Sequence, residues 1–199
     1  MLNVALTGNI AAGKSAVAEL LRQWGATIID ADAIVREVQA PGSPVVRRIG
    51  ERFGQAVVGP DGALDRPALR RLVLDDPEAL AALNRIVHPA VHARRVELLR
   101  DAEARGDRIV VSDIPLLFET ADPDRFDAIV LVDAPEELRL QRLVANRGLS
   151  RDEARRMMQT QLPSRHKRPR SDFVIDNDGD LGELAQRTAE VWQALVERA

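Results

Sequence analysis

The fold is decided by residues 8–15, which read Gly8-Asn9-Ile10-Ala11-Ala12-Gly13-Lys14-Ser15. This stretch matches the pattern Gly-x-x-x-x-Gly-Lys-Ser/Thr of phosphate-binding loops (P-loops). Glycines let backbone N–H groups turn inward around phosphate oxygens, and the lysine supplies a compact cation for the β- and γ-phosphates. The serine hydroxyl is the kind of hard oxygen ligand that Mg²⁺ prefers. The stretch therefore predicts a loop that binds a nucleoside triphosphate, with Mg²⁺ on Ser15.

The segments on both sides of this loop are those that a P-loop requires. Leu2–Leu6 is a short apolar run that predicts a buried strand. Apolar residues then recur at helical spacing from Val17 to Trp24, and Gly25 ends this predicted helix. Its N-terminus is expected to point at the bound phosphate. The residues predicted to bind the nucleotide phosphates are Gly8, Ala11, Ala12, Gly13, Lys14, Ser15 and Ala16.

The rest of the chain alternates short apolar runs with helical patterns. Four further strands are predicted at Ala26–Ile29, Ile109–Val111, Ala128–Val132 and Phe173–Ile175. A helix is predicted to begin at Pro135, and a final one has an apolar stripe from Leu181 to Leu195. Strands separated by helices indicate an α/β fold, here a three-layer P-loop fold with a five-stranded parallel sheet.

Two long segments do not fit simple crossovers between strands. The residues between the second and third predicted strands are mostly helical in pattern, with turns at Pro41-Gly42, Gly59-Pro60 and Asp61-Gly62. Between Arg139 and Arg170 there are nine arginines and one lysine against two acidic residues. We therefore predict a core at 1–32, 106–138 and 171–199, a helical substrate-binding insert at about 33–105, and a helical lid at about 139–170.

Composition excludes several classes of function. The chain has 199 residues, a net charge of −3 and no cysteine. Without cysteine there is no disulfide, no thiol nucleophile and no thiolate metal site. The negative charge disfavours nucleic acid as a partner. No apolar run approaches about 18 residues and no leader pattern precedes the first strand, so we expect no membrane association and a cytoplasmic protein. No obligate protein partner is evident.

Two aspartates follow strands whose carboxyl ends should face the ligand. Asp32 follows the second predicted strand and Asp113 the third. A kinase acting on a hydroxyl needs a carboxylate that orients the acceptor and takes its proton, and we assign this role to Asp32. The alternative is that Asp30 or Asp32 caps the next helix. Asp113 either holds metal-bound water or contacts substrate, or it forms a turn before Pro115.

The arginine-rich segment is expected to close over the nucleotide and to neutralise charge on the transferring phosphoryl group. Arg142 and Arg147 lie near its start and are the candidates for nucleotide contact, while most of the other arginines are expected at the solvated surface. His88 precedes Pro89, so it either lies near the acceptor or shapes a turn. The other two histidines show no metal-ligand spacing.

These motifs together resemble the dephospho-coenzyme A kinase family almost from end to end. Beyond the P-loop, the similar segments are Ile29–Asp32, Phe53-Gly54, Asp61–Arg66, His88-Pro89, Ile114–Glu119, Gln161 and Asp172–Asn177. The resemblance implies a P-loop core, a helical coenzyme A-binding insert and a lid. It also implies transfer of the γ-phosphate of ATP, with Mg²⁺, to the ribose 3′-hydroxyl of dephospho-CoA, the last step of coenzyme A biosynthesis.

The resemblance extends to individual residues. It implies that Asp32 is the base, and Lys14 and Arg142 complete the predicted catalytic set, with Arg142 and Asn177 toward the nucleotide. The predicted substrate-binding residues are Asp32, Arg66, His88, Asp113 and Leu116. The sequence departs from the family pattern at five positions. Asn9, Ala11 and Ala12 stand in a loop that is usually richer in glycine, Ala16 replaces a threonine, and Asn84 replaces a glutamate.

Two other functions fit the P-loop without this resemblance. One is a different P-loop kinase, for nucleoside monophosphates or small sugars, which the insert segments argue against. The other is a nucleotide-dependent switch. A guanine-specific switch would show an Asn-Lys-x-Asp string, but neither lysine of this chain follows an asparagine.

Overall fold

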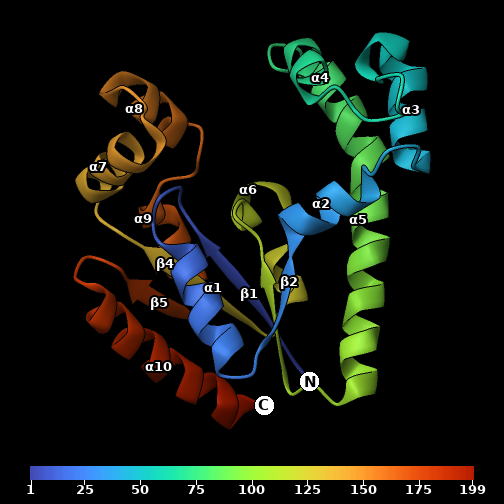
Figure 1. Ribbon diagram of the computed structural model, residues 1–199. Helices are drawn as coiled ribbons and strands as arrows, with labels where there is room; N and C mark the ends of the chain where they lie inside the picture. Colours follow the sequence, from blue (N-terminus) through green and yellow to red (C-terminus); the bar gives the residue numbers. More distant parts are fainter. The chain divides into compact units, whose positions relative to one another are not determined.

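A five-stranded parallel sheet is the centre of the computed structural model, which describes residues 1–199 (Figure 1). The strands are β1 (Leu2–Gly8), β2 (Thr27–Asp30), β3 (Ile109–Asp113), β4 (Ala128–Asp133) and β5 (Phe173–Asp176). Their order in the sheet is β2-β3-β1-β4-β5. The predicted parallel α/β sheet is thus confirmed. Strand order reverses around β1, so the loop after β1 lies at the switch point where ligands of such sheets bind.

Alternate residues of the central strands face two separate apolar clusters. Val4 and Leu6 of β1 pack in a cluster with α1 (Lys14–Gln23) and α10 (Leu181–Arg198). Ala5, between them, belongs to a second cluster, which includes α6 (Leu117–Thr120). Both faces of the sheet are therefore covered, which explains the continuous apolar runs that predicted the strands.

The arginine-rich segment forms a helical pair. α7 (Glu136–Arg147) and α8 (Arg151–Gln159) are followed by the short helix α9 (Ser164–Lys167) and the 3₁₀ turn η3 (Arg168–Arg170). A Ser150–Glu153 capping box begins α8. The pair has its own buried cluster, against which two P-loop residues pack. The members of this lid cluster are Leu140, Leu143, Ala154 and Met158.

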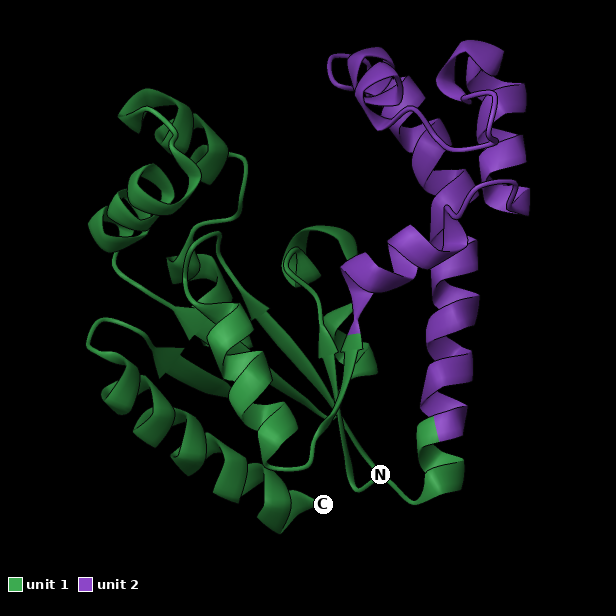
Figure 2. Ribbon diagram, in the orientation of Figure 1, with its two compact units in different colours: residues 1–29, 102–199 green, residues 30–101 purple.

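The chain separates into two compact units, residues 1–29 with 102–199 and residues 30–101 (Figure 2). The second unit is helical, as predicted for the insert. Its elements are α2 (Ala31–Val38), α3 (Pro44–Phe53), η1 (Gln55–Val57), α4 (Arg66–Val73) and the greater part of α5 (Pro77–Arg105). A further 3₁₀ turn, η2 (Pro123–Arg125), lies in the first unit. None of the helices has the length and apolar character needed to span a bilayer.

The interpretation of His88-Pro89 as a turn is wrong, because Pro89 lies inside the continuous helix α5. Pro89 removes one backbone hydrogen bond of the helix, at a cost of about 3 kcal/mol, and disfavours helical geometry at His88, so packing must offset both effects. Ile86 and Val87, before the proline, are buried in the apolar cluster of the insert, and Ala90 and Val91, after it, pack against the same cluster. This continuous apolar face holds the helix together through the proline.

Candidate active site

Both glycines of the P-loop are required by close contacts. A β-carbon on Gly8 would lie 2.6 Å from the carbonyl oxygen of Val132 on the neighbouring strand. Gly13 has a φ of 99°, and a β-carbon there would lie 2.0 Å from Nδ2 of Asn177. Any larger side chain would push the loop away from β4 or from the residue that follows β5.

The loop leaves a row of backbone amides available for phosphate. The amide of Ala12 donates to Asn9 O at 3.0 Å, and that of Ala16 donates to Gly13 O at 3.0 Å. The amides of Gly13, Lys14 and Ser15 have no acceptor among the loop and cap hydrogen bonds of the protein. They belong to the first turn of α1, whose partial positive charge favours an anion. The arrangement therefore suits a phosphate group.

Lys14 forms an ion pair with Oδ1 of Asp113 at the end of β3. Their side chains are 15% and 14% exposed, respectively. An ammonium group has three donors, so Lys14 can bind a phosphate oxygen and keep Asp113 as a partner. Thr7 Oγ1 donates to Pro115 O at 3.3 Å, which fixes the segment after β3 beside the P-loop strand. Leu116 follows at the start of α6 and is 37% exposed.

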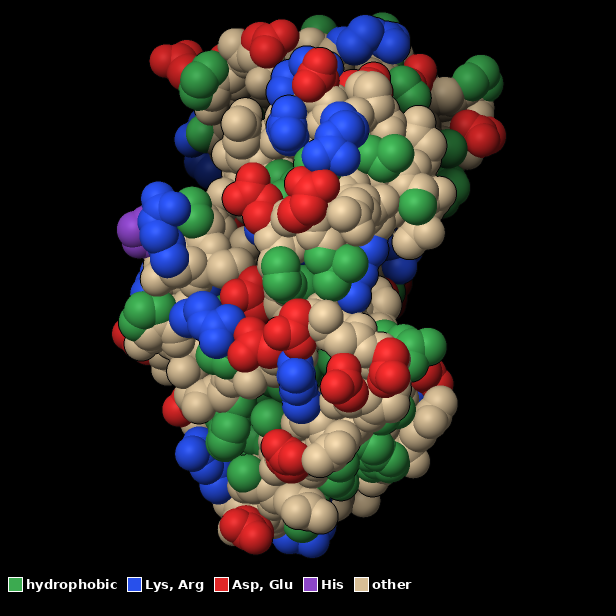
Figure 3. Space-filling model, turned by 90° about the vertical axis from the view of Figure 1, so that its left-hand side faces the viewer, with side chains coloured by type: hydrophobic (Ala, Val, Ile, Leu, Met, Phe, Trp, Pro, Cys, Tyr) green, Lys and Arg blue, Asp and Glu red, His purple; other side chains and the backbone are tan.

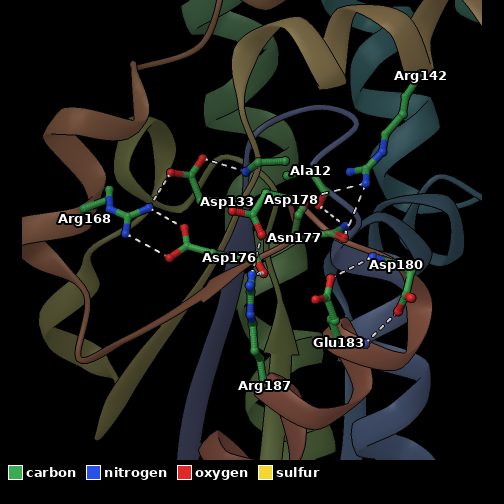
Figure 4. A network of polar contacts seen from close by, with 11 residues as sticks. Ala12, Asp133, Arg142, Arg168, Asp176, Asn177, Asp178, Asp180, Glu183 and Arg187 are labelled. Atoms are coloured by element: carbon green, nitrogen blue, oxygen red, sulfur yellow. Dashed lines mark hydrogen bonds and ion pairs between the residues drawn. The ribbon is translucent and has the colours of Figure 1, made fainter.

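Arg142 and Asn177 bind carbonyl groups of the P-loop, and Figure 4 shows the contacts of Arg142 with Asn177 and of Asn177 with Ala12. The guanidinium of Arg142, on α7, donates to Ala11 O and to the carbonyl and side-chain oxygens of Asn177, each at 3.3 Å. Nδ2 of Asn177 donates to Ala12 O at 2.7 Å. The structure thus brings both predicted nucleotide-side residues to the loop. Because they bind carbonyl oxygens, they help to leave the amides free for phosphate.

The segment that carries Asn177 is itself fixed from two sides. Its backbone amide donates to Asp133 O at 2.7 Å, and Arg187 of α10 pairs with the neighbouring Asp178 at 2.5 Å. The hydrogen bond from Arg187 holds the pKa of the Asp178 carboxyl below its usual range. Asn177 therefore has little freedom to leave the P-loop.

A second polar network lies at the end of β4 and was not predicted from the sequence. Arg168 pairs with Asp133 at 2.9 Å and with Asp176 at 2.6 Å (Figure 4). The hydrogen bonds that Arg168 donates to Asp176 and, to a smaller extent, to Asp133 raise the pKa of Arg168 above its ordinary value. The strand-end rule that selected Asp32 and Asp113 would also have found Asp133, the last residue of β4.

Asn9, a departure from glycine-rich P-loops, is joined to this network. It is 4% exposed, and its Nδ2 donates to Ser164 Oγ at 3.0 Å. Ser164 in turn donates to Asp133 Oδ1 at 2.6 Å. The side chain of Asn9 is therefore buried within the protein, where it contacts Ser164, the first residue of α9.

Ala11 is the one residue other than glycine with a positive φ, at 60°. The left-handed conformation costs an alanine on the order of 1–2 kcal/mol relative to the right-handed one. The contacts to Ala11 O and Ala12 O oppose this cost. The loop consequently keeps its shape with alanine where glycine would be unstrained.

The lid arginines divide into buried and surface residues. Arg139 is 8% exposed and donates from Nε to Ala134 O at 3.1 Å, and burial lowers its pKa. Arg151 pairs with Glu137 at 2.9 Å on the exposed side. Figure 3 shows basic and acidic side chains interspersed on the face seen from the left of Figure 1. Arg147 is exposed at the end of α7 and makes no polar contact with the P-loop.

The remaining predicted residues belong to the second unit. Asp30 caps α2 and accepts from the amide of Ala33 at 3.0 Å, so the alternative that Asp30 or Asp32 caps this helix is confirmed for Asp30 and not for Asp32. Asp32 lies in the first turn of α2 with an exposed side chain. Arg66 is exposed at the first position of α4, and His88 is exposed within α5. The structure of this unit leaves all three side chains accessible to a ligand.

A P-loop at the switch point of a parallel sheet, with an arginine-bearing helix against it, is an arrangement for holding nucleoside triphosphates, and it places the chain in the P-loop class. Within that class, the family model for dephospho-CoA kinase matches residues 2–183. The chain belongs to the dephospho-CoA kinase family.

Individual relatives agree with this result. The chain is 48% identical to a dephospho-CoA kinase of Streptomyces avermitilis, over 100% of this chain and 96% of the relative. It is 44% identical to a dephospho-CoA kinase of Thermobifida fusca, over 100% and 98%. A crystal structure of a Thermus thermophilus protein superposes with a TM-score of 0.86 at 40% identity, covering 97% of this chain and 96% of that one.

Proposed function

We propose that this protein is an ATP-dependent kinase that phosphorylates the ribose 3′-hydroxyl of dephospho-CoA and releases CoA and ADP. The observation that carries the proposal is the match of one family model to residues 2–183, with the P-loop intact inside it. The available amides at the start of α1 add physical support, because they suit the phosphates of the donor. We also propose that the reaction takes place in the cytoplasm.

On the donor side, the P-loop amides and Lys14 would bind the β- and γ-phosphates. Arg142 would stabilise the negative charge that spreads over the transferring phosphoryl group. Its guanidinium already lies beside the loop, on Ala11 O at 3.3 Å. The free amides and the exposed, unpartnered hydroxyl of Ser15 fit a magnesium nucleotide. Bound Mg²⁺ would neutralise charge on the β- and γ-phosphates.

On the acceptor side, we assign Asp32 as the base. The 3′-hydroxyl oxygen attacks the γ-phosphorus in line, while the bond to the oxygen bridging the β- and γ-phosphorus breaks and ADP leaves. Asp32 takes the hydroxyl proton. Its exposed carboxylate in the first turn of α2 is free of a capping role, because Asp30 performs that role. Arg66, His88, Asp113 and Leu116 are the remaining residues that we assign to the acceptor.

The direct test is an ADP-release assay with purified protein, magnesium ATP and dephospho-CoA. AMP and adenosine serve as comparison acceptors, because they offer a ribose without the pantetheine arm. We expect rapid turnover with dephospho-CoA and little with the others. Mass spectrometry of the product should show one added phosphoryl group on the 3′-oxygen.

The same assay separates the alternatives. Turnover on AMP or adenosine but not on dephospho-CoA would support P-loop kinase chemistry and contradict the assignment of dephospho-CoA as the acceptor. ATP hydrolysis that no acceptor stimulates would instead favour a nucleotide-dependent switch. Omission of Mg²⁺ should abolish turnover. Turnover that persists in excess chelator would contradict the assignment of Ser15 as a ligand of Mg²⁺.

A further inference from the structure

The segment after α8 makes two hydrogen bonds with the first half of the P-loop. Oε1 of Gln161 accepts a hydrogen bond from the amide of Ile10 at 2.7 Å. Three residues later, Ser164 Oγ accepts from the side chain of Asn9 at 3.0 Å. We call residues 161–167 the brace. Both contacts fall on the first half of the loop, and the amides of the second half stay available for phosphate.

The brace is fastened to the core independently of the P-loop. Nζ of Lys167, which is fully buried, lies 2.8 Å from Oε1 of Glu119 on α6. The same oxygen accepts from the amide of Leu162 at 2.9 Å. Ser164 donates to Asp133 at the end of β4. Because its two ends and its middle are held by other elements, the brace can impose a position on the loop.

The P-loop of this chain needs such a constraint more than a glycine-rich loop does. Ala11 holds a left-handed backbone conformation that an alanine disfavours. The residue before it, Ile10, donates its amide to Gln161, and its side chain packs against the lid cluster. Conformations of this kind persist where the surrounding structure over-determines them. Ile10 is thus fixed on both its backbone and its side chain next to the strained residue.

We propose that Gln161 is a positioning residue for ATP. It holds the first half of the P-loop so that the amides after Ala11 stay aligned for phosphate. This inference rests on the proposed function of the same site, since it assumes that the loop binds the donor nucleotide. It assigns to Gln161 a role that acts through Ile10, without contact to the reacting atoms.

Replacement of Gln161 by methionine keeps the size of the side chain and removes the acceptor. Loss of one hydrogen bond of about 0.5–1.5 kcal/mol corresponds to a roughly two- to twelvefold rise in the Kd for magnesium ATP. Titration calorimetry without any acceptor measures this Kd. We expect kcat at saturating ATP to fall less than about threefold, since the positioned groups themselves remain. Gln141→Met, on the exposed face of α7, is the matched control.

A second substitution distinguishes positioning from general damage. Ala11→Gly relieves the left-handed strain, so it should restore part of the ATP affinity lost in Gln161→Met. If Gln161→Met unfolds, Ser164→Ala tests the brace through its contact with Asn9 and should raise the same Kd. An unchanged Kd in a folded Gln161→Met variant would overturn the proposal. So would a raised Kd that Ala11→Gly leaves untouched.

The binding readout also separates this inference from the proposed function. If the wild-type protein bound no magnesium ATP, this result would contradict both the role of Gln161 and the proposed kinase function. The protein could instead bind ATP with the expected response to Gln161→Met but fail to phosphorylate dephospho-CoA. That result would support the role of Gln161 and contradict the assignment of dephospho-CoA as the acceptor.

Discussion

The surroundings of the P-loop and the helical insert are built by different means. Around the loop, polar contacts join residues far apart in the chain, such as Asn177 with Ala12 at 2.7 Å. In the insert, residues 30–101, the helices are held by an apolar cluster and by caps that reach three residues ahead, with one ion pair between distant residues, Arg94 and Glu37 at 2.8 Å. Ser43, for example, accepts from the amide of Val46 at 3.2 Å.

From this difference we propose a division of labour between the two units. The polar network fixes the shape of the P-loop within the protein itself, which would reduce the reorganisation that binding and transfer require. The insert presents Asp32, Arg66 and His88 as exposed side chains on helices. Apart from Asp113 and Leu116, which lie in the first unit but are assigned to the acceptor, we expect substitutions in the first unit to change the binding and use of ATP. We expect those in the second unit to change the binding and use of the acceptor.

The strongest test of this division is Asp32→Asn. Removing a general base lowers kcat by about a thousandfold, while the amide keeps the size of the side chain. Because Asp32 belongs to the insert, we expect the KM for ATP to change less than about threefold. Steady-state kinetics with both substrates varied measure the two effects.

Asp30→Asn is the control for this variant, since asparagine caps a helix as well as aspartate does. Its kcat should stay within about twofold of the wild type. If Asp32→Asn weakened ATP binding as much as it lowered kcat, Asp32 would belong to the metal site, and the division between the units would fail.

Lys14→Met tests the other side of the comparison. Loss of one preorganised charge on the phosphates should lower kcat/KM for ATP by about a hundred- to a thousandfold. The Kd for dephospho-CoA, measured by calorimetry without ATP, should change much less, because Asp32, Arg66 and His88 lie in the insert. Of the residues assigned to the acceptor, only Asp113 pairs with Lys14. A parallel loss of dephospho-CoA affinity would show that Lys14 serves both substrates.

The sequence was sufficient for those parts of the site that depend on local pattern. The P-loop, its flanking strand and helix, and the ends of β2 and β3 follow from apolar periodicity and from the position of Gly13 and Lys14. Arg142 and Asn177 came from the family resemblance. Both lie on the loop, although 35 residues separate them in the chain.

The brace could not be predicted, because its contacts depend on how distant elements meet. Gln161 belongs to a family-like segment, but no spacing rule links it to the amide of Ile10, 151 residues earlier. The interpretation of His88-Pro89 as a turn was wrong for a related reason. The local preference of the pair favours a turn, and the apolar face of α5 overrides it.

Lys167→Met compares the two lysines of the chain. Lys167 is fully buried against Glu119, whose side chain is 19% exposed and keeps its hydrogen bond from Leu162. Breaking the pair should cost about 3 kcal/mol of unfolding free energy, at the lower end for buried pairs because Glu119 reaches solvent. Lys14→Met also removes the partner of a largely buried carboxylate, so it should lower this free energy too, but by less, because Lys14 itself is 15% exposed.

Urea unfolding of Lys167→Met, Glu119→Gln and the double variant measures the coupling between the two side chains. We expect the double variant to be less destabilised than the sum of the single ones. Additive losses would mean that Lys167 contributes by packing alone, and the brace would then lack its charged anchor.

The smallest effect is expected in the insert, from Asp65→Ala. Asp65 caps α4 and accepts from the amide of Ala68 at 2.8 Å, so its loss should cost about 1 kcal/mol of unfolding free energy. Arg66, the next residue, begins that helix, and fraying there should raise the KM for dephospho-CoA while the Kd for ATP stays constant. Asp75→Ala, at an exposed position just before α5, should change neither quantity. If Asp65→Ala weakened ATP binding instead, local order in the insert would be coupled to the P-loop, and the two units would have to be treated as one site.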